Sequence, residues 1–315
     1  HPRVRRQRQM CIRDRFLSVV ICTYNRGKYL PMVLDSLKLQ QYPTDSFEIV
    51  LVNNNSTDDT EPIVRAYQQE APSLPLNYLV EYNQGISHSR NRGVKESKGD
   101  IIVFIDDDET VEPDFLRSVN DFFTQYPDAG ISSGPVIPVY ETRQPEWLSL
   151  FTMRLITGAY DKGDHIKPLP PKDYPGTGHA CFRKDLFDKY GAFDTALGRK
   201  GNSLMGAEDK DFFLRLMNGG EKCYYLPAAK IYHHIPDSKL TNGHFKKLTY
   251  ALGRSERIRT LNLGKPAFYK RLSMEIVKWG ASLLLYGWFL LTGRVSKGYK
   301  LLEFRWQVGK GLLGR

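Results

Sequence analysis

Four short apolar runs alternate with three helix-type stretches between residues 16 and 106. The runs are rich in β-branched residues, which favour strands, and they read FLSVVICTY (16–24), FEIVLVNN (47–54), LNYLVEY (76–82) and DIIVFID (100–106). The stretches between them carry apolar residues at helical spacing, or polar and acidic residues typical of a helix start. This repetition predicts an α/β fold, with a mostly parallel central sheet covered by helices on both faces.

The alternation loosens after residue 108. We expect a helix over 113–127, a strand over 130–140, a helix over 208–220, and two short strands over 223–227 and 229–234. The intervening segment 141–178 carries several Pro and Gly residues, and we expect it to be a long loop region. Loops of that length in a compact domain are usually functional.

Three consecutive carboxylates, Asp106, Asp107 and Asp108, follow the fourth apolar run. Like charges this close raise one another's pKa and cost free energy unless a positive charge lies among them. The carboxyl end of a strand is the usual ligand position in an open α/β sheet, and hard divalent cations take oxygen ligands. The cluster therefore predicts a divalent-cation site whose counter-charge arrives with the substrate; a solvated acidic turn is the alternative.

The charge is distributed unevenly along the chain. The formal net charge of +10 includes −8 over residues 16–238 and +13 over 239–315, where sixteen Lys and Arg face three Glu. This asymmetry predicts chemistry in the acidic part and an anionic partner surface for the basic part. We expect a catalytic domain over 16–238 and a basic amphipathic helical tail over 239–315. The four Cys form no CxxC pair, which favours reduced thiols and a cytoplasmic protein.

The most apolar stretch of the tail is WGASLLLYGWFLLTG (279–293), flanked by Lys278 and Arg294. As a helix it would span ~22 Å at ~1.5 Å per residue, less than the ~30 Å hydrocarbon core of a bilayer. Its aromatic residues beside basic ones favour a helix lying in the membrane interface. A core helix and a hairpin dipping into the bilayer are alternatives. Because the aromatics do not interleave with the basic residues, nucleic acid is not an expected partner.

The first fifteen residues, HPRVRRQRQMCIRDR, lack the hydrophobic core of a secretory signal. MCIRDR is also the translation of a transposase adapter used in preparing sequencing libraries. We interpret residues 1–15 as translated adapter sequence, with a genuine basic arm as the alternative. Loss of folding in a chain that starts at Phe16 would contradict the adapter interpretation.

Seven motifs, in this order along residues 16–236, resemble the family-two glycosyltransferases of bacterial polysaccharide synthesis. They are VVICTYNR, LVNNNSTDDT, GISHSRNRGV, FIDDDE, GTGHACFRKDLF, GAEDKDFFLRL and PAAKIYHH. The resemblance implies the GT-A fold, a nucleotide-diphosphate sugar donor, and transfer with inversion. It also implies a divalent metal ion, Mn²⁺ or Mg²⁺.

The resemblance assigns the donor-binding residues. Tyr24 and Asn25 would lie beside the nucleobase, and Asn54 stands where relatives often have an Asp that contacts uracil, which leaves the base open. Arg90 matches the family's ARN triplet and would contact the diphosphate or the sugar; a salt bridge to the acidic cluster is the alternative. Asp106 and Asp107 would also contact the donor. Ordinary packing of Tyr24 is the alternative for that residue.

The resemblance also assigns the metal ligands and the base. Asp106 and Asp108 match the DxD element that holds the metal ion, and His233 matches a position near the metal in some relatives, with His234 as a competitor. Asp209 matches the catalytic base, and Glu208 stands beside it. Capping of a helix is the alternative for the Glu208–Asp209 pair.

Together these features predict a metal-dependent inverting glycosyltransferase on the cytoplasmic face of the cell membrane. It would move a sugar, with a UDP-sugar as the favoured donor, to a saccharide or lipid-linked saccharide. A catalytically inactive module of the same fold that binds nucleotide sugars or glycans is the alternative. The basic tail would bind anionic lipid.

Overall fold

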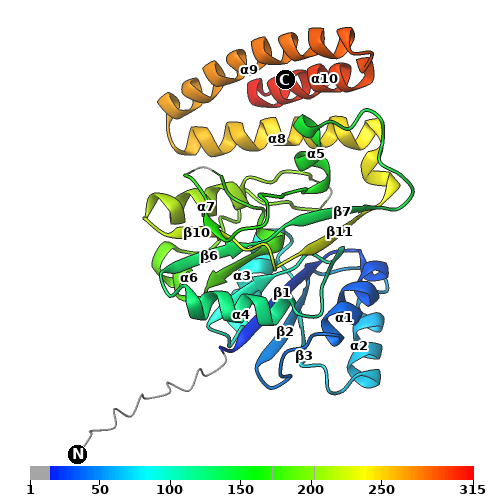
Figure 1. The fold of residues 1–315 in the computed structure, drawn as a ribbon, viewed down its shortest axis with the longest axis vertical. Helices are drawn as coiled ribbons and strands as arrows, with labels where there is room; N and C mark the ends of the chain where they lie inside the picture. The colour runs from blue at the N-terminus through cyan, green and yellow to red at the C-terminus, as the bar shows by residue number, and fades with distance from the viewer. Residues whose placement is uncertain (1–14, 172, 202) are drawn as a thin grey trace, which may run out of the picture.

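The computed structural model describes residues 15–171, 173–201 and 203–315. Its α/β part contains two sheets (Figure 1). The larger has the strand order β3-β2-β1-β4-β9-β6-β10-β8, and the smaller has the order β5-β11-β7. The strands are β1 Leu17–Thr23, β2 Phe47–Asn53, β3 Leu76–Val80, β4 Ile101–Phe104, β5 Glu109–Val111, β6 Ala129–Ser133, β7 Val136–Tyr140, β8 Lys167–Pro168, β9 Ala180–Arg183, β10 Lys222–Tyr225 and β11 Ile231–Ile235. The α/β fold predicted from the sequence is confirmed.

The first four strands are parallel and match the four apolar runs. Their two faces carry separate apolar clusters. The helices α1 (Leu30–Lys38), α2 (Thr60–Glu70) and α4 (Phe115–Gln125) pack on one face, and α3 (Ile86–Glu96), α6 (Asp185–Tyr190) and α7 (Glu208–Asn218) on the other. Residues Ile101–Phe104 of β4 are all buried, as expected for a strand covered on both sides.

The second half of the large sheet differs from the predicted parallel pattern. Strand β9 inserts between β4 and β6 and runs antiparallel to both of them. The single strand expected over 130–140 is wrong, because Gly134 and Pro135 divide it into β6 and β7, which belong to different sheets. The expected loop 141–178 also contains an unpredicted helix, α5 (Leu150–Thr157). These features depend on partners distant in sequence, which local periodicity does not report.

Three helices form the C-terminal layer in Figure 1: α8 (Asn242–Asn262), α9 (Lys265–Leu291) and α10 (Val295–Leu313). Helices α8 and α10 touch through glycines. A Cβ on Gly253 would lie 2.2 Å from the Val308 carbonyl oxygen, and one on Gly311 would lie 2.2 Å from the Tyr250 carbonyl oxygen. The backbones therefore approach more closely than any side chain allows.

Residues 279–291 of the apolar segment form the second half of α9 rather than a short helix of their own. At ~1.5 Å per residue, the 27 residues of α9 extend for ~40 Å, so the helix that contains this segment is longer than the ~22 Å expected for the segment alone. Among the described residues α9 is the one helix long and apolar enough to cross a membrane. Its first half carries charged residues that pair with α8 and α10, including Arg271 and Glu275.

Trp147, in the segment after β7, packs edge-on against Phe245 of α8 at 5.4 Å between ring centroids. It belongs to an apolar cluster that joins α5 to α8 and α10. The Lys300 ammonium group lies 5.2 Å from the centroid of the same ring. Trp147 therefore anchors the C-terminal layer to the segment after β7.

We expect Gly253→Leu to destabilise the protein by about 1–3 kcal/mol, because the new side chain overfills the contact between α8 and α10. Chemical denaturation followed by circular dichroism measures this loss. Gly287→Ala is the matched control, because its Cβ would meet no atom within 4 Å. The control should stabilise the protein by up to ~1 kcal/mol. An unchanged midpoint for Gly253→Leu would contradict the close helix contact.

Candidate active site

The predicted metal-binding and catalytic residues come from three places that meet at one edge of the sheets. Asp106, Asp107 and Asp108 follow β4, where the chain turns toward β5. His233 lies on β11 of the small sheet, paired with Glu109 of β5. The remaining pair, Glu208 and Asp209, begins α7.

Asp107 points back toward the end of β1. Its Oδ2 accepts a hydrogen bond from the Thr23 hydroxyl at 2.8 Å, and its Oδ1 accepts one from Arg26 Nε at 2.8 Å. The side chain is buried. Burial raises the pKa of Asp107 to about 7, against the opposing charge of Arg26, and the neighbouring Asp108 adds to the rise.

Asp108 is also buried and pairs with two cations. Its Oδ2 lies 2.5 Å from Arg26 Nη2 and 2.6 Å from Lys239 Nζ. Burial opposes its ionisation, but His233, Lys239 and Arg26 together hold the pKa of Asp108 well below its usual range. The expectation that counter-charge for this cluster arrives only with the substrate is therefore wrong, because Arg26 and Lys239 supply it within the chain.

His233 fits a ligand position beside Asp108. Its Nδ1 lies 2.7 Å from the Thr157 carbonyl oxygen, to which it donates, and its Nε2 faces Asp108 Oδ2 at 3.4 Å. A backbone acceptor on one ring nitrogen fixes the tautomer that leaves the other free to ligate. His234 faces away, since its Nε2 lies 3.1 Å from the Thr110 hydroxyl. Within the described part of the chain no three His, Cys, Asp or Glu side chains converge as a complete ligand set.

Asp106 is the most accessible of the three carboxylates, with 46% of its side chain exposed. Its backbone N–H donates to Glu109 Oε2 at 3.0 Å. A Cβ on Gly178 would lie 2.3 Å from the Asp106 carboxyl group, so only glycine leaves room for this side chain. The segment after β8 therefore sets the position of Asp106.

Arg90 connects the acidic cluster to the start of α7. The guanidinium is buried, with Nη1 at 2.6 Å from Asp209 Oδ1 and 3.2 Å from Glu208 Oε1. Its Nη2 lies 3.9 Å from Asp106 Oδ1. The salt-bridge alternative for Arg90 thus describes its contacts in this structure, although its shortest bond goes to the predicted base.

The pKa values of the two carboxylates at the start of α7 are shifted in opposite directions. Burial raises the pKa of Glu208 to about 7, and the adjacent Asp209 adds to the rise. Burial also opposes ionisation of Asp209, but Arg90 and hydrogen bonds from Thr177 outweigh it and lower its pKa. Environments that move the pKa values of two neighbouring carboxylates in opposite directions are typical of acid–base sites. Asp209 is therefore the carboxylate that stays ionised.

The predicted nucleobase residues lie around the ends of β1 and β2. Asn25 has a positive φ of 52°, and its side chain accepts a hydrogen bond from the Thr57 N–H at 2.7 Å. The Asn54 amide donates to the carbonyl oxygens of Glu81 and Asn83, and it accepts from the Gly85 N–H. These bonds tie β2 to the following loop, so Asn54 shapes the site's wall. Tyr24 is half-buried beside them.

Sequence reasoning missed two cations of the site, Arg26 and Lys239. Arg26 stands in the quoted motif VVICTYNR, one residue after Asn25, so its position past the first strand was a usable signal. Lys239 carries no local signal: it lies in the short helix Asp237–Leu240, 131 residues after Asp108. Arg92, the other arginine of the motif GISHSRNRGV, pairs with Glu96 at 3.1 Å.

Residues 18–191 match the family model described as "Glycosyl transferase family 2". The match covers more than half of the chain, and the protein belongs to this family, as its sequence motifs predict. The matched range includes the acidic cluster and Arg90 and ends before Asp209.

Named relatives agree with this membership. The chain is 27% identical over 250 residues to the "Glucosyl-dolichyl phosphate glucuronosyltransferase" of Haloferax volcanii, covering 78% of this chain and 77% of that protein. The fold resembles the mannosyltransferase PcManGT from Pyrobaculum calidifontis in complex with GDP-Man and Mn²⁺, with TM-score 0.60, 18% identity, and coverage of 96% and 88%. It also resembles S. aureus TarS 1–349 in complex with UDP, with TM-score 0.55, 18% identity, and coverage of 95% and 92%. The predicted GT-A fold is thereby confirmed.

We expect Glu208→Gln to flatten the pH dependence of stability between pH 5 and 7. In this window the folded chain retains a proton on Glu208 that the unfolded chain, with its ordinary pKa of 4.5, has released. Stability from this group is therefore present at low pH and lost as pH rises toward 7, by up to about 3 kcal/mol. Urea denaturation at pH 5, 6 and 7 measures it. Glu70→Gln, at an exposed position of α2, is the control and should keep the wild-type dependence of stability on pH. The same dependence in Glu208→Gln would refute the raised pKa of Glu208.

Proposed function

We propose that this protein is an inverting, metal-dependent glycosyltransferase that uses a nucleotide-diphosphate sugar. The observation that carries the proposal is the position of buried Arg90 between the predicted base and the predicted metal-binding acids. The Arg90 guanidinium lies 2.6 Å from Asp209 and 3.9 Å from Asp106. The predicted base and a predicted metal-binding acid thus both border the Arg90 guanidinium. They do so at the carboxyl edge of β4, the usual ligand position in such sheets.

The donor would lie across the ends of β1, β2 and β4. Tyr24 and Asn25 would border its base, with Asn54 holding the loop behind it. Arg90, Asp106 and Asp107 would face the diphosphate side. UDP is the favoured nucleotide. The solved TarS fragment supports it through its UDP complex, while PcManGT in complex with GDP-Man keeps GDP as the second choice.

Asp106, Asp108 and His233 would hold Mn²⁺ or Mg²⁺. The PcManGT complex with Mn²⁺ supports a divalent ion, and the carboxylate and imidazole groups suit one. Such an ion neutralises charge on a departing nucleotide diphosphate. Because Arg26 and Lys239 already pair with Asp108, both side chains must turn toward the diphosphate or remain as additional counter-charge when the ion binds.

Asp209 would accept the proton of the acceptor hydroxyl as its oxygen bonds to the anomeric carbon. The bond from that carbon to the diphosphate oxygen breaks in the same step, so the configuration inverts. The lowered pKa of Asp209 keeps it ionised and ready to accept. Glu208 lies 3.2 Å from the Arg90 guanidinium, and it would share this positive charge with Asp209.

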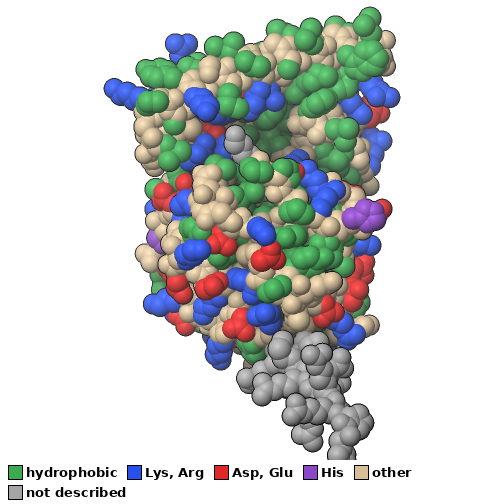
Figure 2. All heavy atoms as spheres, turned by 60° about the vertical axis from the view of Figure 1, so that its left-hand side comes forward, with side chains coloured by type: hydrophobic (Ala, Val, Ile, Leu, Met, Phe, Trp, Pro, Cys, Tyr) green, Lys and Arg blue, Asp and Glu red, His purple; other side chains and the backbone are tan. Residues whose placement is uncertain are grey.

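The acceptor would be a saccharide or a lipid-linked saccharide at the cytoplasmic face of the membrane. We propose a catalytic domain over 16–238 and a membrane-associated tail over 239–315. The Haloferax relative supports a lipid-linked acceptor by its name. The tail supports membrane contact through exposed apolar side chains on α9, including Ile276, Val277, Leu284 and Leu291, with basic residues around them (Figure 2).

The alternative is a catalytically inactive module that binds nucleotide sugars or glycans. The presence of both the metal-binding acids and an ionised base argues against it. The two proposals differ in their product: an active enzyme releases nucleotide diphosphate in the presence of acceptor, and a binding module does not.

We expect UDP or GDP to raise the melting temperature only in the presence of Mn²⁺ or Mg²⁺. At ~100 times its dissociation constant, a ligand adds ~2.7 kcal/mol of apparent stability. Asp108→Asn should abolish the metal-dependent shift, whereas Asp209→Asn should keep it and lose transfer. Asp45→Asn, at an exposed loop position, is the control. Transfer at the wild-type rate in Asp209→Asn would exclude this base, and metal-independent shifts would exclude the metal site.

We expect the protein to float with vesicles that contain an anionic phospholipid. Leu284→Glu should weaken this association about tenfold or more, since burying a leucine side chain contributes about 1.5–3 kcal/mol. Leu39→Glu, at an apolar position 67% exposed after α1, is the matched control. Flotation that is equal for both variants, or a wholly soluble wild-type protein at low salt, would contradict the membrane assignment.

A further inference from the structure

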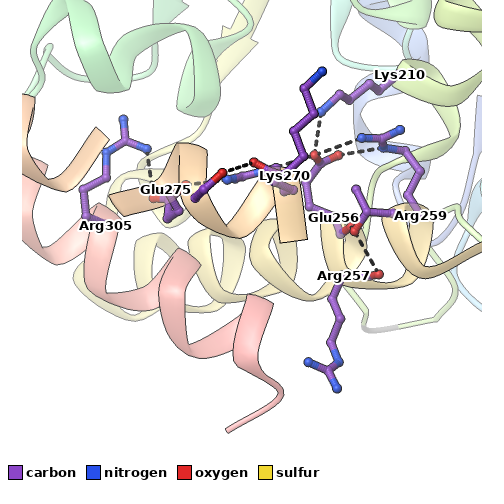
Figure 3. A network of polar contacts seen from close by, with 10 residues as sticks. Lys210, Glu256, Arg257, Arg259, Lys270, Glu275 and Arg305 are labelled. Atoms are coloured by element: carbon purple, nitrogen blue, oxygen red, sulfur yellow. Dashed lines mark hydrogen bonds and ion pairs between the residues drawn. The ribbon is translucent and has the colours of Figure 1, made fainter. Parts of the chain in front are cut away.

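A polar network joins α7 to all three helices of the C-terminal layer (Figure 3). Glu256 of α8 is at its centre, 2.6 Å from Lys210 Nζ of α7, 2.9 Å from Arg259 Nε and 3.3 Å from Arg271 Nε. Arg271 Nη1 also lies 2.7 Å from Glu275. We call Lys210, Arg259 and Arg271 the cationic cluster.

The network has more positive than negative charge. Glu256 and Glu275 are its two carboxylates, and Arg305 of α10, 3.3 Å from Glu275, is a fourth cation of the network outside the cationic cluster. Burial lowers the pKa of Lys210, and the charges of Arg259 and Arg271 lower it further against the pull of Glu256. A group of partly buried cations this crowded is stabilised by an additional anion.

The cationic cluster also has unused hydrogen-bond donors. Arg259 and Arg271 each direct two of their N–H-bearing nitrogens at carboxylates, and Lys210 directs its ammonium group at Glu256 alone. A guanidinium has five N–H donors and an ammonium three. Among the residues that the structure describes, no further acceptor meets these groups, so donors remain for a ligand.

The cationic cluster is close to the proposed chemistry. Lys210 directly follows Asp209 on α7. The Tyr174 ring stacks on Phe213 of the same helix at 5.4 Å.

The surface is hollowed where the C-terminal layer meets the α/β part. Figure 2 shows Lys and Arg side chains beside this hollow and hydrophobic side chains on the helices above it. An amphiphile with an anionic head fits such a surface, because its head meets the cations while its chain follows the apolar face of α9.

We propose that Lys210, Arg259 and Arg271 bind a phosphate group of a lipid-linked acceptor. This inference rests on the proposed function, whose acceptor it specifies. The guanidinium groups offer paired N–H donors to phosphate oxygens, and the added negative charge balances the network. The phosphate would hold the acceptor's saccharide toward Asp209 and its lipid chain toward α9.

A headgroup of the surrounding bilayer could supply the same phosphate chemistry. The exposed fractions of the side chains favour the acceptor: 31% for Lys210, 9% for Arg259 and 11% for Arg271. Side chains this recessed meet a ligand that enters between α7 and the C-terminal helices rather than a headgroup in the plane of the membrane.

The test uses the full chain and farnesyl phosphate as the probe, with farnesol as the uncharged comparison, in neutral phosphatidylcholine vesicles. We expect the wild-type protein to bind farnesyl phosphate about tenfold or more tightly than farnesol, because charge-assisted hydrogen bonds are the difference. Lys210→Met should remove most of this preference, and Lys210→Arg should restore it. Lys297→Met removes an equal charge from a partly exposed position at the start of α10 and should leave the preference unchanged.

Equal binding of farnesol and farnesyl phosphate by the wild-type protein would overturn the inference without any variant. Loss of the preference in Lys297→Met to the same extent as in Lys210→Met would also overturn it, since the effect would then be general charge. Replacement of bound farnesyl phosphate by phosphatidylglycerol vesicles at equal phosphate concentration would assign the site to bilayer headgroups. A missing nucleotide shift beside intact farnesyl phosphate binding would refute the donor proposal instead.

Discussion

The arrangement of this site depends on one buried cation, Arg90. It holds together two carboxylates from α7 and faces a third from the turn after β4, so elements more than a hundred residues apart share a single charge. Removing one partner from a buried pair of this kind costs about 3–5 kcal/mol, because the remaining charge has no solvent. The same guanidinium lowers the pKa of Asp209, whereas burial raises the pKa of Glu208 despite the charge of Arg90. Arg90 therefore contributes both to the stability of the protein and to the proposed chemistry.

A second set of cations governs the acidic cluster. Arg26 spans Asp107 and Asp108, and Lys239 reaches Asp108 from the segment after β11. Three adjacent carboxylates can therefore fold without a bound ion, and the site is organised before a ligand arrives. In our proposal a metal ion competes with these side chains for Asp108, so its affinity depends on how well the donor diphosphate takes over Arg26 and Lys239.

A structural feature could be predicted from the sequence where residues close to it in the chain determine it. Strands β1 to β4 could be predicted, because a strand buried on both faces must be apolar over its whole length. The antiparallel insertion of β9 and the division of 130–140 could not, because each is decided by a strand distant in sequence. The acidic cluster and the Glu208–Asp209 pair were recognisable from their motifs. Lys239 was not, since nothing near it in the chain distinguishes it from the other lysines of a basic segment.

The contact between Asp108 and Lys239 also bears on how the protein is made. Its two residues are 131 positions apart, and the chain that emerges from a ribosome contains the carboxylate long before the ammonium group. Contacts of such separation form late, because loop closure must precede them. The nascent sheet therefore carries a buried carboxylate with incomplete neutralisation until the segment beyond β11 has been synthesised. The last cation of the site is therefore supplied by the segment that leads into the C-terminal helices, which is translated after the rest of the site.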